Sequence, residues 1–238
     1  MHDKENVTVN TGLAQDNINV PWKISDVIFT YFLIFALSIM AVGIILISGI
    51  DADTSIFPAV LQIVLSFTTI AVIYYIVTKK YNFSFIDAFG LYFNKTPRYL
   101  WQGIVATAFI LIGTTLVSIT FTQVFGVEKQ NPYINVPAEK LRIISILAIF
   151  LAPVVEEIFF RGFMQPALMK SLGTFGGICV TALIFGMSHS QYLDYSTALV
   201  AVTVIGLILG TTRYYTGSVI PGIIAHLLNN LFAAMSLH

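Results

Sequence analysis

The chain has 238 residues, of which 57% are hydrophobic and only 10% are charged. Soluble domains carry about 25% charged residues on average, so this composition favours an integral membrane protein surrounded by membrane lipid. Twelve basic and twelve acidic residues give a formal net charge of zero. Nucleic-acid binding therefore has no electrostatic support and is not expected.

The N-terminal tail, residues 1–24, is polar. It lacks the basic segment and short apolar core that mark a cleavable signal peptide. The first apolar segment is therefore expected to stay in the mature protein.

Apolar segments of about 20 residues follow the tail, each long enough for a helix that crosses a bilayer. They cover residues 25–50, 55–78, 100–126, 141 to beyond 161, 174–190, 197–213 and 218–237. The predicted fold class is therefore all-α, a polytopic transmembrane bundle of about seven helices. Residues 79–99 carry several basic and aromatic side chains and predict an interfacial loop or short amphipathic helix. Residues 127–140 contain two prolines and are expected to be irregular.

Basic residues outside the apolar segments are divided unevenly between the two sides of the predicted bundle. The side of the N-terminus carries eight, namely Lys4, Lys23, Lys79, Lys80, Lys95, Arg98, Lys170 and Arg213. The opposite side carries three, Lys129, Lys140 and Arg142. Because positively charged loops stay in the cytoplasm, this bias predicts a cytoplasmic N-terminus. The plasma membrane is the expected location.

Ionisable side chains interrupt the fourth apolar segment at Glu156, Glu157 and Arg161. Such groups cost at least a few kcal/mol each at membrane depth, so they usually face a protein interior or a wet cavity. Glu157 and Arg161 have the i,i+4 spacing and order that favour an ion pair on one helix face. Glu156 lies about 100° further around the helix, which leaves it available for a reaction. The alternative is a purely structural pair with both acids solvated.

Histidines occur in the fifth and seventh apolar segments, and the first of them, His189, lies at nearly the same depth as Glu156. If the fourth and fifth helices turn near residues 172–173, Glu156 and His189 each lie about 16 residues, or roughly 24 Å, from that turn. His226 lies nearer the membrane centre and shares a helix face with Asn230. We therefore expect these side chains to converge on one cavity, with room for water where Pro153 bends the fourth helix.

Three motifs in this half of the chain resemble those of a known family. They are Glu156-Glu157-Ile-Phe-Phe-Arg161, Phe185-Gly-Met-Ser-His189 and His226-Leu-Leu-Asn-Asn230. In this order they resemble the CPBP family, which comprises the type II CAAX prenyl proteases and their bacterial Abi, bacteriocin-processing and lysostaphin-resistance-like relatives. The resemblance covers about residues 141–237, and no comparable motif precedes it.

The resemblance implies an intramembrane endopeptidase that acts on a peptide or protein substrate, such as a leader peptide, a signalling peptide or a prenylated tail. By motif, Glu156 and His189 would activate the attacking water. His226 and Asn230 would stabilise the oxyanion of the tetrahedral intermediate. The remaining motif residues would support the site structurally, and these are Glu157, Arg161 and Phe185.

The same resemblance suggests how the chain is organised. A polar tail (1–24) would precede N-terminal transmembrane helices with an interfacial loop (25–126). A catalytic core of four membrane helices would then occupy residues 141–238.

Participation of a metal ion is left open by the sequence. Glu156, His189 and His226 could together ligate zinc in a catalytic site. However, the His-Glu-x-x-His signature is absent. A zinc site would also need acceptors that orient both imidazoles, and Glu157 is expected to be committed to Arg161. A metal-free glutamate mechanism without a cofactor is therefore favoured over zinc.

Two non-proteolytic functions fit the same residues. A membrane immunity or binding protein of the same family could keep all three motifs without catalysis. A small proton-coupled transporter could use Glu and His side chains as a proton relay, although the chain lacks inverted hydropathy repeats. Cleavage of a substrate by the wild type but not by a Glu156→Ala protein would favour the protease.

Overall fold

The computed structural model describes residues 20–49, 56–127, 136–192 and 194–236. The prediction of a polar tail falls mostly on residues 1–19, and that of an irregular connection mostly on residues 128–135, both outside the described part. Within the described ranges every regular element is a helix, so the all-α fold class is confirmed.

The following helical elements lie in the predicted apolar segments. They are α1 (Ile24–Ile47), α2 (Ile56–Tyr75), α4 (Thr96–Phe125), α5 (Ala138–Phe150), α6 (Ala152–Glu156), the π-helical segment η4 (Glu157–Met164), α7 (Gln165–Ser188), α8 (Ser196–Thr216) and α9 (Ile220–Met235). Short elements join them, namely η2 (Ile76–Lys80), α3 (Phe85–Phe89), η3 (Phe93–Lys95) and η5 (Ser190–Tyr192). The short amphipathic helix expected within residues 79–99 is α3.

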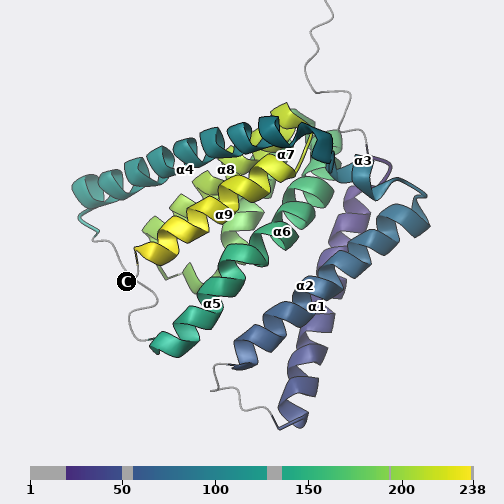
Figure 1. Ribbon diagram of the computed structural model, residues 1–238, viewed down its shortest axis with the longest axis horizontal. Coiled ribbons are helices and arrows are strands. Elements are labelled where there is room, and N and C mark those ends of the chain that lie inside the picture. The colour runs from purple at the N-terminus through teal and green to yellow at the C-terminus, as the bar shows by residue number, and fades with distance from the viewer. Residues whose placement is uncertain (1–19, 50–55, 128–135, 193, 237–238) are drawn as a thin grey trace, which may run out of the picture.

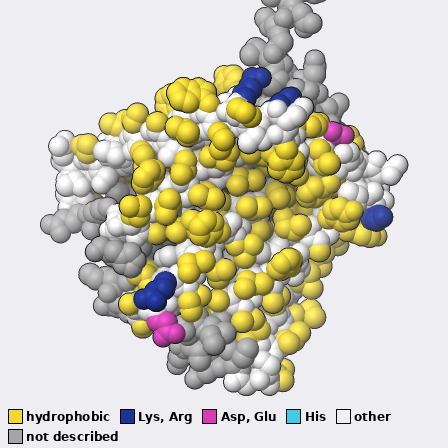
Figure 2. Space-filling view, viewed as in Figure 1, with side chains coloured by type: hydrophobic (Ala, Val, Ile, Leu, Met, Phe, Trp, Pro, Cys, Tyr) yellow, Lys and Arg dark blue, Asp and Glu magenta, His cyan; other side chains and the backbone are white. Residues whose placement is uncertain are grey.

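Five helical stretches among the described residues are long and apolar enough to cross a membrane. They are Ile24–Ile47, Phe57–Lys80, Phe85–Phe125, Ala152–Ser188 and Ser196–Thr216. At most 33% of the most apolar part of any of these spans is buried inside the protein. Hydrophobic side chains cover the middle of the face in Figure 2, and the charged side chains visible there lie at its rim. A surface of this kind is stable against lipid and not against water, so the chain is an integral membrane protein.

The predicted hairpin between the fourth and fifth apolar segments turns at Gly173. This residue interrupts α7 with φ 73° and ψ 168°, a backbone conformation that glycine adopts without the steric cost of a Cβ. Before the turn, α5 ends at Phe150 and α6 begins at Ala152, with Leu151 between them. Pro153 lies in the first turn of α6. The φ of −91° and ψ of −50° at Leu151 remain helical, so the bend predicted near Pro153 stays a prediction.

The helices surround η4, whose eight residues are all buried. Helix α4 packs on α8 and α9, and α7 packs on α8. Helices α1 and α2 form a pair that contacts α5 and α6 on one side of the molecule, opposite α4 (Figure 1). This arrangement places η4 where the N-terminal and C-terminal halves of the chain meet.

The basic residue Arg213 does not lie in a loop, contrary to the prediction. Its side chain is 1% exposed in the last turn of α8, and Nη2 donates a hydrogen bond to the Ala88 carbonyl oxygen at 2.9 Å. Without Arg213, the predicted count of basic loop residues on the side of the N-terminus falls from eight to seven, against three on the opposite side. The predicted orientation therefore does not change.

Residues 20–23 contact the core directly, which the polar composition of the tail did not indicate. Trp22 is fully buried, its Nε1 donates to the Phe163 carbonyl oxygen at 2.8 Å, and its ring stacks on Phe163 at 5.3 Å between centroids. Lys170 Nζ donates to the Val20 carbonyl oxygen at 3.4 Å. The start of the described chain is therefore fixed against η4 and α7.

Replacing Trp22 by phenylalanine is expected to lower stability by about 1 kcal/mol, because it removes one buried hydrogen bond and keeps an aromatic ring for stacking. The measurement is the midpoint of thermal unfolding in detergent. The matched control is Trp101→Phe, since the Trp101 side chain is 66% exposed. Equal midpoints for both variants would contradict the role of the Trp22 hydrogen bond.

Candidate active site

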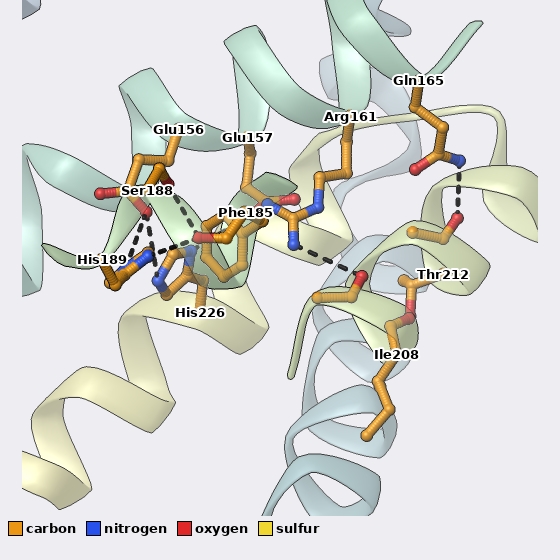
Figure 3. A network of polar contacts seen from close by, with 12 residues as sticks. Glu156, Glu157, Arg161, Gln165, Phe185, Ser188, His189, Ile208, Thr212 and His226 are labelled. Carbon is orange, nitrogen blue, oxygen red and sulfur yellow. Dashed lines mark hydrogen bonds and ion pairs between the residues drawn. The ribbon is translucent and has the colours of Figure 1, made fainter. Parts of the chain in front are cut away.

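Glu156 lies between the two histidines that the motifs single out (Figure 3). Its Oε2 atom is 3.9 Å from His189 Nε2 and 3.8 Å from His226 Nε2. Glu156 ends α6, His189 caps the C-terminus of α7, and His226 lies in α9. The convergence predicted from their depth in the membrane is therefore found.

Each imidazole is oriented through its other nitrogen. His189 Nδ1 lies 2.7 Å from the Phe185 carbonyl oxygen, and His226 Nδ1 lies 3.3 Å from Glu157 Oε1. Carbonyl and carboxylate oxygens only accept hydrogen bonds, so both Nδ1 atoms carry the proton. Each Nε2 atom is then an acceptor in a neutral ring and a donor in a ring that is protonated on both nitrogens.

This arrangement suits a bridging water. Glu156 Oε2 has no hydrogen-bond partner among the described residues. Two acceptors 3.8 or 3.9 Å apart are too distant for a direct hydrogen bond, yet one water about 2.8 Å from each could donate to both. These distances match a water whose two hydrogens are held by a carboxylate and an imidazole, and because Oε2 is buried, the side chains must move apart to admit it.

Glu157 and Arg161 form the predicted i,i+4 ion pair, with Arg161 Nη1 3.1 Å from Glu157 Oε1. Both side chains are fully buried. The guanidinium carbon lies 4.0 Å from the centroid of the Phe185 ring, and Nη2 donates to the Gly206 carbonyl oxygen at 3.4 Å. Glu157 Oε1 also contacts His226 Nδ1, so this buried ion pair orients one of the two imidazoles.

Exposure separates the two carboxylates. The Glu156 side chain is 27% exposed and that of His189 is 18% exposed, whereas Glu157 is 0% exposed. Parts of the Glu156 and His189 side chains therefore face the outside, although Glu156 Oε2 itself is buried, and Glu157 is enclosed completely. The difference agrees with a reactive role for the first acid and a structural role for the second, which remain predictions.

Phe185 is the residue around which the site is packed. Its ring is 1% exposed and lies 4.6 Å from the His189 ring and 5.8 Å from the His226 ring, both in edge-to-face geometry. Together with its contact to Arg161, this position agrees with the predicted structural support.

Asn230 lies one helical turn beyond His226 on α9, and its amide is already engaged. Nδ2 donates to the Ala148 carbonyl oxygen in α5 at 2.8 Å. An amide nitrogen carries two hydrogens, so one remains for a substrate. The predicted role of Asn230 at the oxyanion therefore rests on this second hydrogen.

Sequence reasoning missed Gln165, which extends the polar face of η4 into α7. Its Nε2 donates to the Gly210 carbonyl oxygen at 2.9 Å, as Arg161 does to that of Gly206. The spacing of Glu157, Arg161 and Gln165 at intervals of four residues could have indicated it. Gly206 and Gly210 pack closely against Ala182 and Gln165, and their carbonyl oxygens accept the hydrogen bonds of Arg161 and Gln165.

Zinc does not fit the side chains as they are placed. Ligand atoms of a tetrahedral zinc lie roughly 3.3 Å apart, less than the separations of Glu156 Oε2 from the two Nε2 atoms. No group of three His, Cys, Asp or Glu side chains in the described ranges is arranged to hold a metal ion. The acceptors that would orient both imidazoles are present, namely the Phe185 carbonyl oxygen and Glu157, and Glu157 is also paired with Arg161 as predicted.

Comparison with known proteins identifies the same family as the motifs. Residues 138–232 match the family model described as type II CAAX prenyl endopeptidase Rce1-like. No curated protein and no solved structure matches the chain. The resemblance predicted from the three motifs is therefore confirmed for this segment, which contains every residue of the candidate site.

Proposed function

We propose that the chain is an intramembrane endopeptidase in which Glu156 and His189 activate water for attack on a peptide bond. The observation that supports this most is the approach of Glu156 Oε2 to His189 Nε2 and His226 Nε2 at 3.9 and 3.8 Å within a partly open site. The fully buried ion pair beneath it keeps the second carboxylate out of the reaction.

In the proposed reaction, the water between Glu156 and His189 attacks the carbonyl carbon of the scissile bond. As the new C–O bond forms, Glu156 accepts one proton of the water, and His189 Nε2 accepts a hydrogen bond from the other. The carbonyl oxygen becomes an oxyanion. Holding the water by two acceptors orients it for attack and removes the entropic cost of capturing it from solution.

The oxyanion is proposed to be stabilised from α9. A His226 ring protonated on both nitrogens donates from Nδ1 to Glu157 and from Nε2 to the oxyanion. The free amide hydrogen of Asn230 is the second donor. Each donor of this kind contributes a few kcal/mol to transition-state stabilisation.

Collapse of the tetrahedral intermediate completes the reaction. The C–N bond breaks, and Glu156 returns the proton it took from water to the leaving amine nitrogen. The products are a carboxyl terminus and an amine, and the site regains an ionised Glu156. Atoms and charge therefore balance without a redox partner.

The proposed substrate is a peptide or protein segment presented at the membrane, for example a prenylated tail, a leader peptide, or a bacteriocin or signalling peptide. The plasma membrane is the proposed location. The family match favours peptide cleavage, and the 27% exposure of the Glu156 side chain places it at the edge of the protein, where such a segment could displace its neighbours to reach the buried Oε2 atom.

The test is cleavage of a peptide library by purified protein in lipid vesicles, with new termini detected by mass spectrometry. The library contains prenylated and unprenylated versions of each peptide. Wild type is expected to create new termini, and Glu156→Ala is expected to create none. A protein that binds peptides equally well before and after this substitution but cleaves none would be a binding protein instead, and proton flux that Glu156→Ala abolishes would identify a transporter.

Activity is expected to survive prolonged treatment with a zinc chelator, because the proposed reaction uses only side chains and water. The measurement is the initial rate of cleavage before and after dialysis against the chelator, with a known zinc protease as a positive control. Loss of activity that stoichiometric zinc restores would replace the glutamate mechanism by a zinc mechanism and leave the peptidase assignment intact.

A further inference from the structure

The end of the short helix α3 is joined to the turn between α8 and α9. Three consecutive carbonyl oxygens at the end of α3 accept hydrogen bonds, one from the last turn of α8 and two from the turn between α8 and α9. Ala88 accepts from Arg213 Nη2 at 2.9 Å, Phe89 from the Val219 backbone nitrogen at 3.0 Å, and Gly90 from Ser218 Oγ at 2.6 Å. Because these bonds are largely buried and consecutive, α3 and the start of α9 move as one unit.

Gly90 shows how close this contact is. It has φ 63°, and a Cβ there would lie 2.2 Å from the Gly217 carbonyl oxygen. No other residue fits without displacing one of the two segments. The approach of α3 to the turn is therefore fixed by backbone contact.

The other side of α3 contacts η4 through the Phe89 ring. Phe89 is fully buried, and a Cβ added to Gly162 would lie 2.1 Å from Phe89 Cδ1 and 2.4 Å from Cε1. The ring therefore lies directly on the backbone of η4. Gly162 follows Arg161, the partner of Glu157.

These contacts connect the two elements that must meet in the site. Helix α9 carries His226, and η4 carries Glu157, whose Oε1 lies 3.3 Å from His226 Nδ1. Residues 85–90 lie outside the segment 138–232 that matches the family model. The contact through Phe89 is thus supplied by a part of the chain to which no function has been assigned.

We propose that Phe89 is a positioning residue that sets the distance between His226 and the Glu156–Glu157 pair by holding α9 against η4. The expected effect of Phe89 on the rate of cleavage rests on the proposed function. Its expected effect on the position of His226 does not. A displacement of about 1 Å at a catalytic group can lower a rate by about 10²-fold. A contact outside the site that shifts His226 by this amount is therefore sufficient to change the rate of the reaction.

The first test is a double-mutant cycle on Phe89 and Gly162. Phe89→Leu is expected to lower kcat about tenfold with little change in KM, because substrate still binds but His226 is misplaced. Gly162→Ala is expected to lower kcat about 10²-fold, because its Cβ overlaps the Phe89 ring. The double variant is expected to be more active than Gly162→Ala alone, because leucine vacates part of the overlapped volume.

The matched control is Gly113→Ala, where the added Cβ would lie 3.0 Å from Val204 Cγ1 in the contact between α4 and α8. It is expected to retain the wild-type kcat. Thermal unfolding measured on each variant establishes the folded fraction, and Phe89→Met replaces Phe89→Leu if the latter does not fold. Effects of Phe89→Leu and Gly162→Ala that simply multiply would overturn the proposal.

The second test needs no activity. In protein with nitrogen-15-labelled histidines and no substrate, Phe89→Leu is expected to shift the ring nitrogen resonances of His226. Those of His189 should stay unchanged, because its Nδ1 partner, the Phe185 carbonyl oxygen, belongs to the same helix. Spectra of His226→Gln and His189→Gln provide the assignments. Unchanged His226 resonances, or equal shifts of both histidines, would overturn the positioning role, whereas absence of peptide cleavage alone would count only against the proposed function.

Discussion

Replacing Glu156 by glutamine is expected to reduce peptide cleavage by about 10²–10⁴-fold, the contribution of a positioned general base. The amide has nearly the same shape as the carboxylate but cannot accept a proton from water. The Glu156 side chain is 27% exposed and makes no hydrogen bond through Oε2 within the described residues, so the substitution should leave folding almost unchanged. The measurement is kcat for a cleaved peptide in lipid vesicles, together with the folded fraction.

The matched control is Glu139→Gln, because Glu139 is an exposed acid in the first turn of α5. It should retain wild-type kcat. A Glu156→Gln protein that cleaves at more than a tenth of the wild-type rate would remove Glu156 from the role of base. His189→Gln would then be the next variant, since the second acceptor of the water would have to take the proton.

The convergence of the site was predictable because helix geometry converts sequence distance into depth. Glu156 and His189 are about equally far from the turn at Gly173, so a straight hairpin brings them to one level. The ion pair of Glu157 and Arg161 followed from i,i+4 spacing in the same way. Both predictions needed only regular helices and one correctly placed turn.

Contacts between segments remote in sequence were not predictable by this reasoning. Trp22 and Phe163 are 141 residues apart, and Arg213 and Ala88 are 125 apart. No periodicity relates the members of such pairs, since each helix shows only its own apolar face. Arg213 was misplaced for this reason, because a basic residue near a helix end is typical of a loop until the carbonyl it binds is known.

The orientation of the two imidazoles was also beyond the sequence. It depends on a backbone carbonyl at Phe185 and on a carboxylate that Arg161 shares with His226. The i,i+4 pattern identified the pair of Glu157 and Arg161 but gave no reason to add a third partner from α9. A carboxylate has two oxygens with several acceptor positions, so Glu157 can pair with Arg161 on its own helix and still accept a hydrogen bond from His226 on α9.

Replacing Arg161 by alanine is expected to lower the stability of the folded protein by about 3–5 kcal/mol, because it leaves the carboxylate of Glu157 buried without its cation. The variant also loses the contact of the guanidinium with the Phe185 ring at 4.0 Å. Since folded proteins are stable by about 5–15 kcal/mol in total, much of the protein should fail to accumulate. The measurements are the amount of monodisperse protein extracted from membranes and its thermal unfolding midpoint.

The control for Arg161→Ala is Arg142→Ala, because Arg142 is exposed near the start of α5. The double variant Glu157→Gln with Arg161→Met separates charge from packing. It removes both charges and keeps side chains of similar length, so the folded amount should recover towards that of the wild type. Cleavage should stay low in this double variant, because a neutral amide holds His226 Nδ1 less strongly than a carboxylate does. If Arg161→Ala alone accumulates and unfolds like the wild type while turnover slows, Arg161 acts on the reaction and not on the fold.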